Sequence, residues 1–292
     1  YGMPGALLES NFAQLTRRQT RFPRDHADDK DYYFKLGAGS DFSNFGALDC
    51  DVSFRRKDTN SFFPDANAGW KPVYKGRIDT LGVTPKYIHK LDLFGVSNKF
   101  VTGADIYRYD YSMDNFSNSD ILQNVTDINK FSQGYYIQDD VTLFKRLTFV
   151  GGYRYESARY DFDYNDYAVF SPNPDVDSSM KPQESAYNAG ISYNYIGDSN
   201  LFFDYSRSFR FPATDEFFSW GSLNTDLKAQ TANNYEVGLR HRFNKDAGVS
   251  VSVFNMNIKN ELYYNPLGGP FGLGANENYD KTRHQGIEFN SD

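Results

Sequence analysis

The residues of this sequence that could do chemistry are mostly arginines, aspartates and aromatics, and the first group stands near the start of the chain. The run RRQTRFPRDH, residues 17–26, is locally basic although the whole chain carries a formal net charge of −7. Its arginines are Arg17, Arg18, Arg21 and Arg24. Such a cluster could attract an anionic ligand. It could equally pair with phosphates at a lipid surface or with the nearby carboxylates of Asp25, Asp28 and Asp29.

A second pattern has the ligand spacing of a calcium-binding loop. In DFDYNDY, oxygen-bearing side chains stand at Asp161, Asp163 and Asn165. The sixth position of such a loop needs glycine and the twelfth needs glutamate, but this chain has Asp166 and Pro172 there. We therefore interpret the stretch as a solvated loop, with calcium in an outer loop as the alternative, and we predict no metal site.

Aromatic side chains in the long connections could line the mouth of a binding site, because aromatic rings suit planar ligands. The main candidates are Phe217, Phe218, Trp220 and Tyr263, and the set extends to Phe116, Phe170 and Phe271. The alternative interpretation is that these rings pack one loop against another or lie at a membrane interface.

Signs of covalent chemistry are missing from the sequence. Its four histidines are far apart and lack zinc spacing. Cys50 is the only cysteine, and no Gly-x-Ser-x-Gly turn marks a nucleophile. We therefore predict neither an enzyme nor a bound cofactor. The acidic charge balance also argues against a nucleic-acid partner.

The elements that must position these groups show alternation of apolar and polar residues. Tyr187, Ala189, Ile191 and Tyr193, for example, alternate with polar or small residues, and a period of two is typical of strands. A bulge after Val253 would restore the alternation that breaks there. We expect no helix and about 11 strands, over residues 31–40, 46–57, 75–91, 98–111, 131–144, 147–161, 184–196, 200–210, 233–243, 248–262 and 281–290.

The connections between these strands alternate between short and long. Tight turns are expected within residues 41–45, 93–97, 145–146, 197–199 and 244–247, and long polar or Gly/Pro-rich loops at 58–74, 112–130, 162–183, 211–232 and 263–280. Outer-membrane barrels have this asymmetry, with short turns at one end and long extracellular loops at the other. The sequence therefore predicts an all-β chain, an antiparallel up-and-down transmembrane β-barrel. A soluble sandwich or propeller is the alternative, although its strands are usually shorter.

One predicted strand shows where an arginine would lie in such a barrel. In SRSFRFPATDEFF, which begins at Ser206, Arg207 falls on the lipid side near the strand end, where its long side chain can reach headgroups. Phe209 and Phe211 suit an aromatic girdle. Pro212 ends the strand because it has no N–H to donate, and a long outside loop follows.

The same region resembles the barrel of TonB-dependent outer-membrane receptors. The resemblance rests on YSRSFRFPATDEFF (205–218), QTANNYEVGLRHRF (230–243), VFNMNIKNELYYNP (253–266), NYDKTRHQGIEFNSD (278–292), GYYIQDDVTLFKRLTFVGGYRYE (134–156) and YGMPGAL (1–7). It covers essentially the whole chain. The family barrel has 22 strands, so about 11 strands correspond to half of a barrel. The family's plug domain and TonB-contacting segment have no counterpart in these residues.

The resemblance implies an outer-membrane receptor of a Gram-negative bacterium that imports a scarce nutrient, most often a ferric siderophore or cobalamin, with energy delivered through TonB. The chain would be a partial barrel (residues 1–292), and its residues 1–30 would form an extracellular loop. The arginines of this loop could contact a ferric catecholate or lipopolysaccharide. Inner-wall networks that hold the plug would include Arg210, Glu236, Arg240, Arg283 and Glu288. A passive porin-like channel and a soluble β-rich binding module remain the alternatives.

Overall fold

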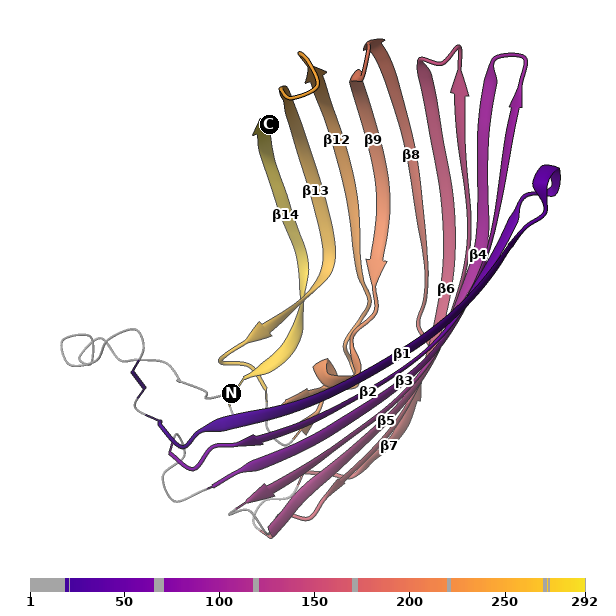
Figure 1. Ribbon diagram of the computed structural model, residues 1–292. Coiled ribbons are helices and arrows are strands. Elements are labelled where there is room, and N and C mark those ends of the chain that lie inside the picture. Colours follow the sequence, from indigo (N-terminus) through magenta and orange to yellow (C-terminus); the bar gives the residue numbers. More distant parts are fainter. Residues whose placement is uncertain are drawn as a thin grey trace.

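The computed structural model describes residues 19–20, 22–65, 71–117, 121–169, 173–219, 222–269, 272 and 274–291. Within these residues, one large antiparallel sheet of long strands curves around an open hollow (Figure 1), and a second sheet consists of two short strands only. The strands along its path are β1 (His26–Asp41), β2 (Ala47–Phe62), β3 (Val73–Leu93), β4 (Val96–Ser117), β5 (Ile121–Leu143), β6 (Leu147–Asp166), β8 (Gln183–Ile196), β9 (Ser199–Arg210), β12 (Gln230–Arg242), β13 (Gly248–Asn265) and β14 (Ala275–Ser291).

Neighbours in this sheet are also neighbours in the sequence, so the topology is up-and-down. The short β7 (Val176–Met180) adds to β6 beside the path. Smaller elements lie between β9 and β12: the 3₁₀ helix η3 (Thr214–Phe217) and the two-residue strands β10 (Phe218–Ser219) and β11 (Ser222–Leu223). A further 3₁₀ turn, η2 (Ser43–Phe45), joins β1 to β2. The all-β class, the antiparallel topology and the eleven strands of the path confirm the sequence prediction.

The strands are longer than predicted at the end that carries the long connections. β4 and β5 pair to Ser117 and Ile121, so only residues 118–120 separate two strands where a loop over 112–130 was expected. The prediction was wrong there because Asp, Asn and Ser side chains occupy both strand ends and mimic a loop composition. β6 likewise continues through the predicted calcium-like loop to Asp166, and β1 begins at His26, inside the predicted loop of residues 1–30.

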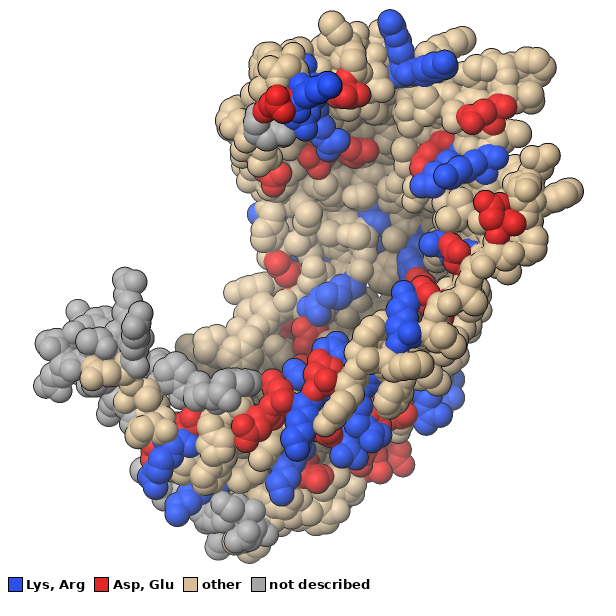
Figure 2. Space-filling view, viewed as in Figure 1, with Lys and Arg blue, Asp and Glu red and all other residues tan. Residues whose placement is uncertain are grey.

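The two faces of the sheet differ in chemistry. On the convex face, paired positions bring together rows of exposed apolar side chains, such as Phe203 with Ile191 on one side and with Val237 on the other. On the concave face, Asp204 and Glu236 stand opposite each other, and Arg154 extends from β6. Basic and acidic groups are interspersed rather than segregated in the space-filling view (Figure 2). No helix in the described part of the chain is long and apolar enough to cross a membrane.

The bulge expected after Val253 is absent. β12 and β13 pair without a register shift through Val253–Val237 and Phe254–Glu236, so Phe254 lies on the concave face. Its ring lies where a side chain at Gly286 would otherwise stand, because a Cβ there would come within 2.9 Å of the ring. A real register shift occurs elsewhere, between Asn115 and Phe116 of β4.

The tight turns cluster at one end of the sheet, and several of them hold non-glycine residues at positive φ: Ser43 after β1, Phe94 after β3, and Phe144 and Lys145 after β5. Phe94 and Gly95 join β3 to β4 with φ angles of 51° and 80°. A two-residue turn with positive φ at both positions is type I′, which favours Asn-Gly. Phe94 is 96% exposed, so no packing within the described residues offsets this conformation.

Replacing Phe94 by asparagine is therefore expected to stabilise the folded protein in detergent. The Phe94→Asn variant should gain roughly 1 kcal/mol, because asparagine adopts left-handed backbone more readily than a bulky residue. Urea unfolding of the full-length product in detergent micelles would measure the gain. A loss of stability in micelles would contradict the strain argument, and a loss confined to lipid bilayers would show that the ring anchors the turn at the interface.

Candidate functional site

A buried aromatic cluster joins the connection between β9 and β12, the 211–229 loop, to the concave wall. Phe217 of η3 is completely buried, with its ring centroid 5.2 Å from that of Tyr160 and 4.9 Å from that of Phe162, both edge-on. Tyr111, Ile128, Ala158, Phe211 and Leu227 complete the cluster. Pairs of this kind contribute about 0.5–1.5 kcal/mol beyond the area they bury. The loop therefore folds into the curve of the sheet, where η3 lies in Figure 1.

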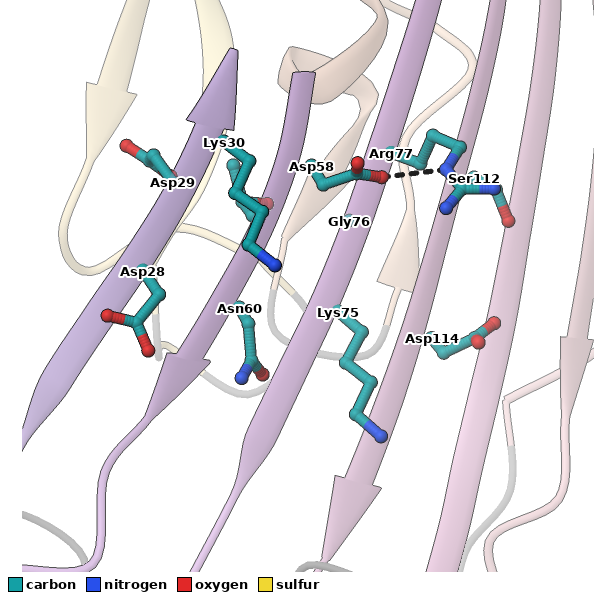
Figure 3. Close-up of a pocket in the computed structure, with 11 residues that line it drawn as sticks. Asp28, Asp29, Lys30, Asp58, Asn60, Lys75, Gly76, Arg77, Ser112 and Asp114 are labelled. Carbon is teal, nitrogen blue, oxygen red and sulfur yellow. Dashed lines mark hydrogen bonds and ion pairs between the residues drawn. The ribbon is translucent and has the colours of Figure 1, made fainter. Parts of the chain in front are cut away.

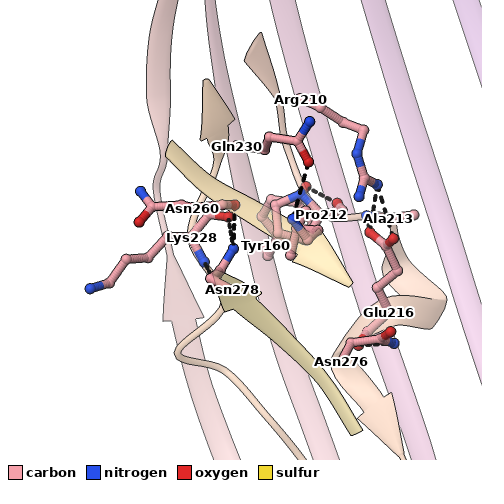
Figure 4. Close-up of polar contacts among 11 residues, drawn as sticks. Tyr160, Arg210, Pro212, Ala213, Glu216, Lys228, Gln230, Asn260, Asn276 and Asn278 are labelled. Carbon is pink, nitrogen blue, oxygen red and sulfur yellow. Dashed lines mark hydrogen bonds and ion pairs between the residues drawn. The ribbon is translucent and has the colours of Figure 1, made fainter. Parts of the chain in front are cut away.

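A polar clamp fixes the start of the same loop (Figure 4). The Tyr160 hydroxyl donates to the Pro212 carbonyl over 2.7 Å. One carboxylate oxygen of Glu216 lies 2.8 Å from the Arg210 guanidinium and accepts from the Ala213 backbone N–H, also at 2.8 Å. Arg210, which the sequence analysis placed among plug-facing groups, thus holds the loop in this structure.

The far side of the loop is held by asparagines of β14. Asn276 donates its amide to the Glu216 carbonyl over 3.0 Å. Asn278 accepts from the Lys228 N–H at 2.9 Å and donates to the Lys228 and Asn260 carbonyls at 3.1 and 2.8 Å. An asparagine amide offers both donors and an acceptor, so each can satisfy backbone groups that a loop leaves unpaired. Figure 4 shows these side chains converging on the loop from β14.

Lys130 lies beneath the loop among aromatic rings. Its ammonium is 4.9 Å from the ring centroid of Tyr160, 5.1 Å from that of Tyr109 and 6.0 Å from that of Phe211. A cation within about 6 Å of an aromatic face is attracted by the ring quadrupole. Lys130 therefore ties β4, β5 and β6 to the first residue of the loop.

A three-residue ion network lies farther along the concave wall. Arg154 of β6 donates to Asp105 of β4 over 2.5 Å and to Glu156 over 2.6 Å. All three side chains are less than one-third exposed. The sequence analysis missed this network, although the spacing Arg-x-Glu places Arg154 and Glu156 on one face of a strand.

The other inner-wall predictions have mixed outcomes. Glu236 stands opposite Asp204, Glu288 opposite Ser252, and Arg240 lies 4.8 Å over the Phe202 ring, all on the concave face. Arg283 does not join them. It shares the convex face with Ile287 and donates to Asn255 over 2.9 Å, so its assignment to the inner wall was wrong. Arg283 and Glu288 are five positions apart, and an odd separation places two residues on opposite faces of a strand.

The aromatic residues that were predicted to contact a ligand lie in different surroundings. Phe217 has no surface to offer a ligand, so the loop-packing alternative holds for it. Phe218 is half-buried beside Tyr164, with ring centroids 6.4 Å apart. Tyr263 stacks on Tyr279 at 3.8 Å and donates to Glu277. Trp220, Phe170 and Phe271 lie outside the described residues, as do Arg17, Arg18 and Arg21.

Arg24 alone represents the basic run in the described part of the chain. It binds Asp65, which follows β2, through its side chain and its backbone N–H. These hydrogen bonds hold the pKa of Asp65 below its usual range and raise the pKa of Arg24. Arg24 therefore pairs with an aspartate, as one of the alternatives for this run expected, but its hydrogen-bond partner is Asp65, which that alternative did not name.

No group of histidine, cysteine or acidic residues in the described ranges could hold a metal ion. Asp161 of the calcium-like stretch pairs with Arg159 at 2.8 Å, and Asp163 accepts from Asn165 at 2.7 Å. Both lie in β6, where an extended backbone cannot wrap around a cation.

The family model described as "TonB dependent receptor-like, beta-barrel" matches residues 3–292. The chain belongs to this family. TonB-dependent receptors are outer-membrane transport receptors of Gram-negative bacteria, not enzymes. Among curated proteins, none matches the chain.

Solved structures of TonB-dependent receptors share the fold of this receptor barrel. The ferric-catecholate import receptor Fiu from K12 E. coli superposes with a TM-score of 0.72 at 15% identity, over 100% of this chain and 49% of Fiu. The ferric citrate transporter FecA gives 0.79 at 14%, over 99% and 42%. The hemophore receptor HasR of Serratia marcescens gives 0.69 at 15%, over 91% and 46%. This receptor barrel therefore spans less than half the length of each.

Proposed function

We propose that the chain is about half of the barrel of a receptor that imports a ferric siderophore across the outer membrane, with cobalamin as the second nutrient of this class and with energy supplied through TonB. The observation that carries the proposal is the 211–229 loop, which folds into the concave side and is fixed to both β6 and β14. When held on the concave side, the 211–229 loop narrows the opening of the barrel at the end that carries the long connections. This arrangement suits capture of a large ligand better than free diffusion.

The comparisons support the same ligand class. Fiu is a ferric-catecholate import receptor, FecA is a ferric citrate transporter, and HasR forms a complex with its hemophore HasA and heme. Ligands of the first two kinds are anionic iron complexes, to which the basic run that begins at Arg17 is complementary. A plug and its TonB-contacting segment would belong to the same receptor. Residues 1–25 would then lead into the barrel as an outside loop.

The residues of the concave wall have two roles in this proposal. Glu236, Arg240 and Glu288 contribute polar groups that would hold a plug, whereas Arg210 shapes the loop through Glu216. Phe218, Trp220 and Tyr263 remain the aromatic candidates for ligand contact, together with Arg17, Arg18 and Arg21. The Arg210→Gln/Glu236→Gln double variant should therefore reduce transport or barrel stability, and an unaffected variant would refute these roles.

Uptake by cells tests the function. The full-length gene product is expressed in a Gram-negative host without siderophore or cobalamin receptors, and cells are supplied with radioactive iron in catecholate and citrate complexes or with labelled cobalamin. We expect uptake of one iron complex that disappears when TonB is deleted or the proton gradient is collapsed. Uptake that persists without TonB would identify a passive channel, and a product in the soluble fraction would identify a binding module instead.

A further inference from the structure

Glu216 of the 211–229 loop occupies Arg210 as a bound anion would (Figure 4). Its Oε1 and Oε2 atoms lie 2.9 and 2.8 Å from a single nitrogen of Arg210, Nη1. The other guanidinium nitrogens of Arg210, Nε and Nη2, have no hydrogen-bond partner in the part of the chain that the structure describes. Because a guanidinium presents a fork of several donors, much of its capacity to bind a carboxylate is still unused.

A second cation, Lys130, lies beneath the same loop. Its ammonium lies among aromatic rings and makes no ion pair within the described ranges. Glu156 and Glu216 are the carboxylates that attract it, and Glu156 is already hydrogen-bonded to Arg154 at 2.6 Å. Glu216 therefore neutralises much of the positive charge that Arg210 and Lys130 place beneath the loop.

The contact between Glu216 and Arg210 contributes less to the stability of the loop than its other contacts do. The two side chains are 25% and 44% exposed, and an ion pair this open to solvent contributes little. Phe217, by contrast, is completely buried, and burial of a phenylalanine contributes several times more. The Glu216 side chain can therefore turn away from Arg210 while the loop stays in place. The Ala213 N–H, which donates to Glu216 over 2.8 Å, then becomes available to another acceptor.

We propose that Glu216 is an internal competitor for a carboxylate-bearing ligand. Arg210, Lys130 and the Ala213 N–H form the site, and the ligand binds there when Glu216 turns away. The class of ligand follows from the present occupant, because donors placed 2.8–2.9 Å from one carboxylate suit another. The inference rests on the proposed function and names its ligand as an iron complex with free carboxylates.

The internal competitor makes this site selective. A group on the same chain competes at an effective concentration on the order of millimolar. A simple monocarboxylate below that concentration cannot displace Glu216, whereas a ligand that adds contacts with the concave wall can. Cobalamin, whose periphery carries amides in place of carboxylates, gains nothing from this site.

An arginine–carboxylate pair on β2 and β3 provides a matched control. Arg77 pairs with Asp58 at 2.7 Å, and their exposed fractions of 57% and 32% are similar to those of the pair beneath the loop. The control pair lines a groove of about 930 Å³ across β1 to β4 (Figure 3). Apart from this pair, the charged residues of the lining are three aspartates and two lysines. Loss of the Asp58 carboxylate therefore leaves no net positive site.

Ligand binding by single variants tests the proposal. The full-length product, purified in a nonionic detergent, is titrated calorimetrically with ferric citrate and with a ferric catecholate. Glu216→Gln should bind ferric citrate about fivefold more tightly, which corresponds to about 1 kcal/mol, the upper value for an exposed pair. Asp58→Asn should bind it as the unaltered receptor does. Weaker binding by Glu216→Gln, an equal gain from Asp58→Asn, or binding of the catecholate alone would overturn the proposal.

Removal of the arginine shows whether Glu216 competes for it. Arg210→Gln should weaken binding of ferric citrate roughly tenfold, because hydrogen bonds to a charged group are lost. In Arg210→Gln/Glu216→Gln the fivefold gain should disappear, since the competitor no longer has this cation to occupy. A gain that persists without Arg210 would contradict direct competition. Hydrogen exchange of residues 217–229 should be unchanged in Glu216→Gln, and lost protection there would mean that Glu216 holds the loop rather than masks a site.

Citrate without iron separates this inference from transport. It should bind in the millimolar range and gain the same factor from Glu216→Gln, because Arg210 contacts the carboxylate and not the iron. A receptor that shows this gain but imports no iron complex would leave the carboxylate site standing and the proposed function refuted. A receptor that imports an iron complex without any gain from Glu216→Gln would have the opposite meaning.

Discussion

Alanine in place of Phe217 is expected to release the 211–229 loop from the concave wall. Removing a fully buried phenylalanine typically costs about 3–5 kcal/mol, and here the loss falls on contacts with Tyr160 and Phe162. Because the strands pair through their own backbones, the loop should loosen while the sheet persists. Hydrogen exchange of the full-length product should show lost protection in residues 213–229 and unchanged protection in β4–β6.

Transport provides the second measurement for this variant. Uptake of the iron complex should fall at limiting concentration if the loop captures the ligand, because a mobile loop must be ordered on binding. Leu267→Ala is the control, since Leu267 is a loop residue that is 81% exposed and its truncation removes little packing. Unchanged exchange in the Phe217→Ala variant would show that the aromatic cluster does not anchor the loop.

Replacing Arg154 by methionine is the second change with a large expected effect. The variant leaves Asp105 and Glu156 without the guanidinium that bridges them at 2.5 and 2.6 Å. Breaking such a partly buried network should cost about 3 kcal/mol, because uncompensated carboxylates remain on the wall. Urea unfolding in detergent would measure the loss.

The same strand supplies a matched control for this variant. Arg159 pairs with Asp161 two residues away, as Arg154 does with Glu156, but on the convex face and with both side chains about half exposed. Arg159→Met should change stability by less than about 1 kcal/mol. The triple variant Arg154→Met/Asp105→Asn/Glu156→Gln should recover most of the loss. Equal losses of stability in the Arg154 and Arg159 variants would contradict the expectation that the partly buried ion network contributes more to stability than the exposed pair.

Strand positions were predictable from the sequence wherever one face of the sheet is apolar. The alternation from Tyr187 to Tyr193 identified β8 almost to its ends. It failed beyond the apolar band, where the convex face becomes polar and the apolar side chains, such as Ile128 and Phe162, lie on the concave face. The end of β4 beyond Tyr111 and the start of β5 before Phe131 were therefore read as a loop, although Ser112 pairs directly with Asp127.

The candidate site was less predictable, because its contacts join distant parts of the chain. Nothing in the sequence around Phe217 indicates that its ring meets Tyr160, and the amide groups of Asn276 and Asn278 look like ordinary loop residues. Both facts depend on how the sheet curves. Arg283 is the opposite case, since a strict count of two from Glu288 would have placed it on the convex face.

The 211–229 loop also has a mechanical consequence for the receptor. It is fastened to β6 through Tyr160 and to β14 through Asn276 and Asn278, although β8, β9, β12 and β13 separate those strands along the sheet. A segment that is attached to two separated strands of a curved sheet resists changes in the curvature of the sheet between them. The loop thus stiffens this wall against breathing motions. Displacement of the loop would leave this wall freer to change its curvature.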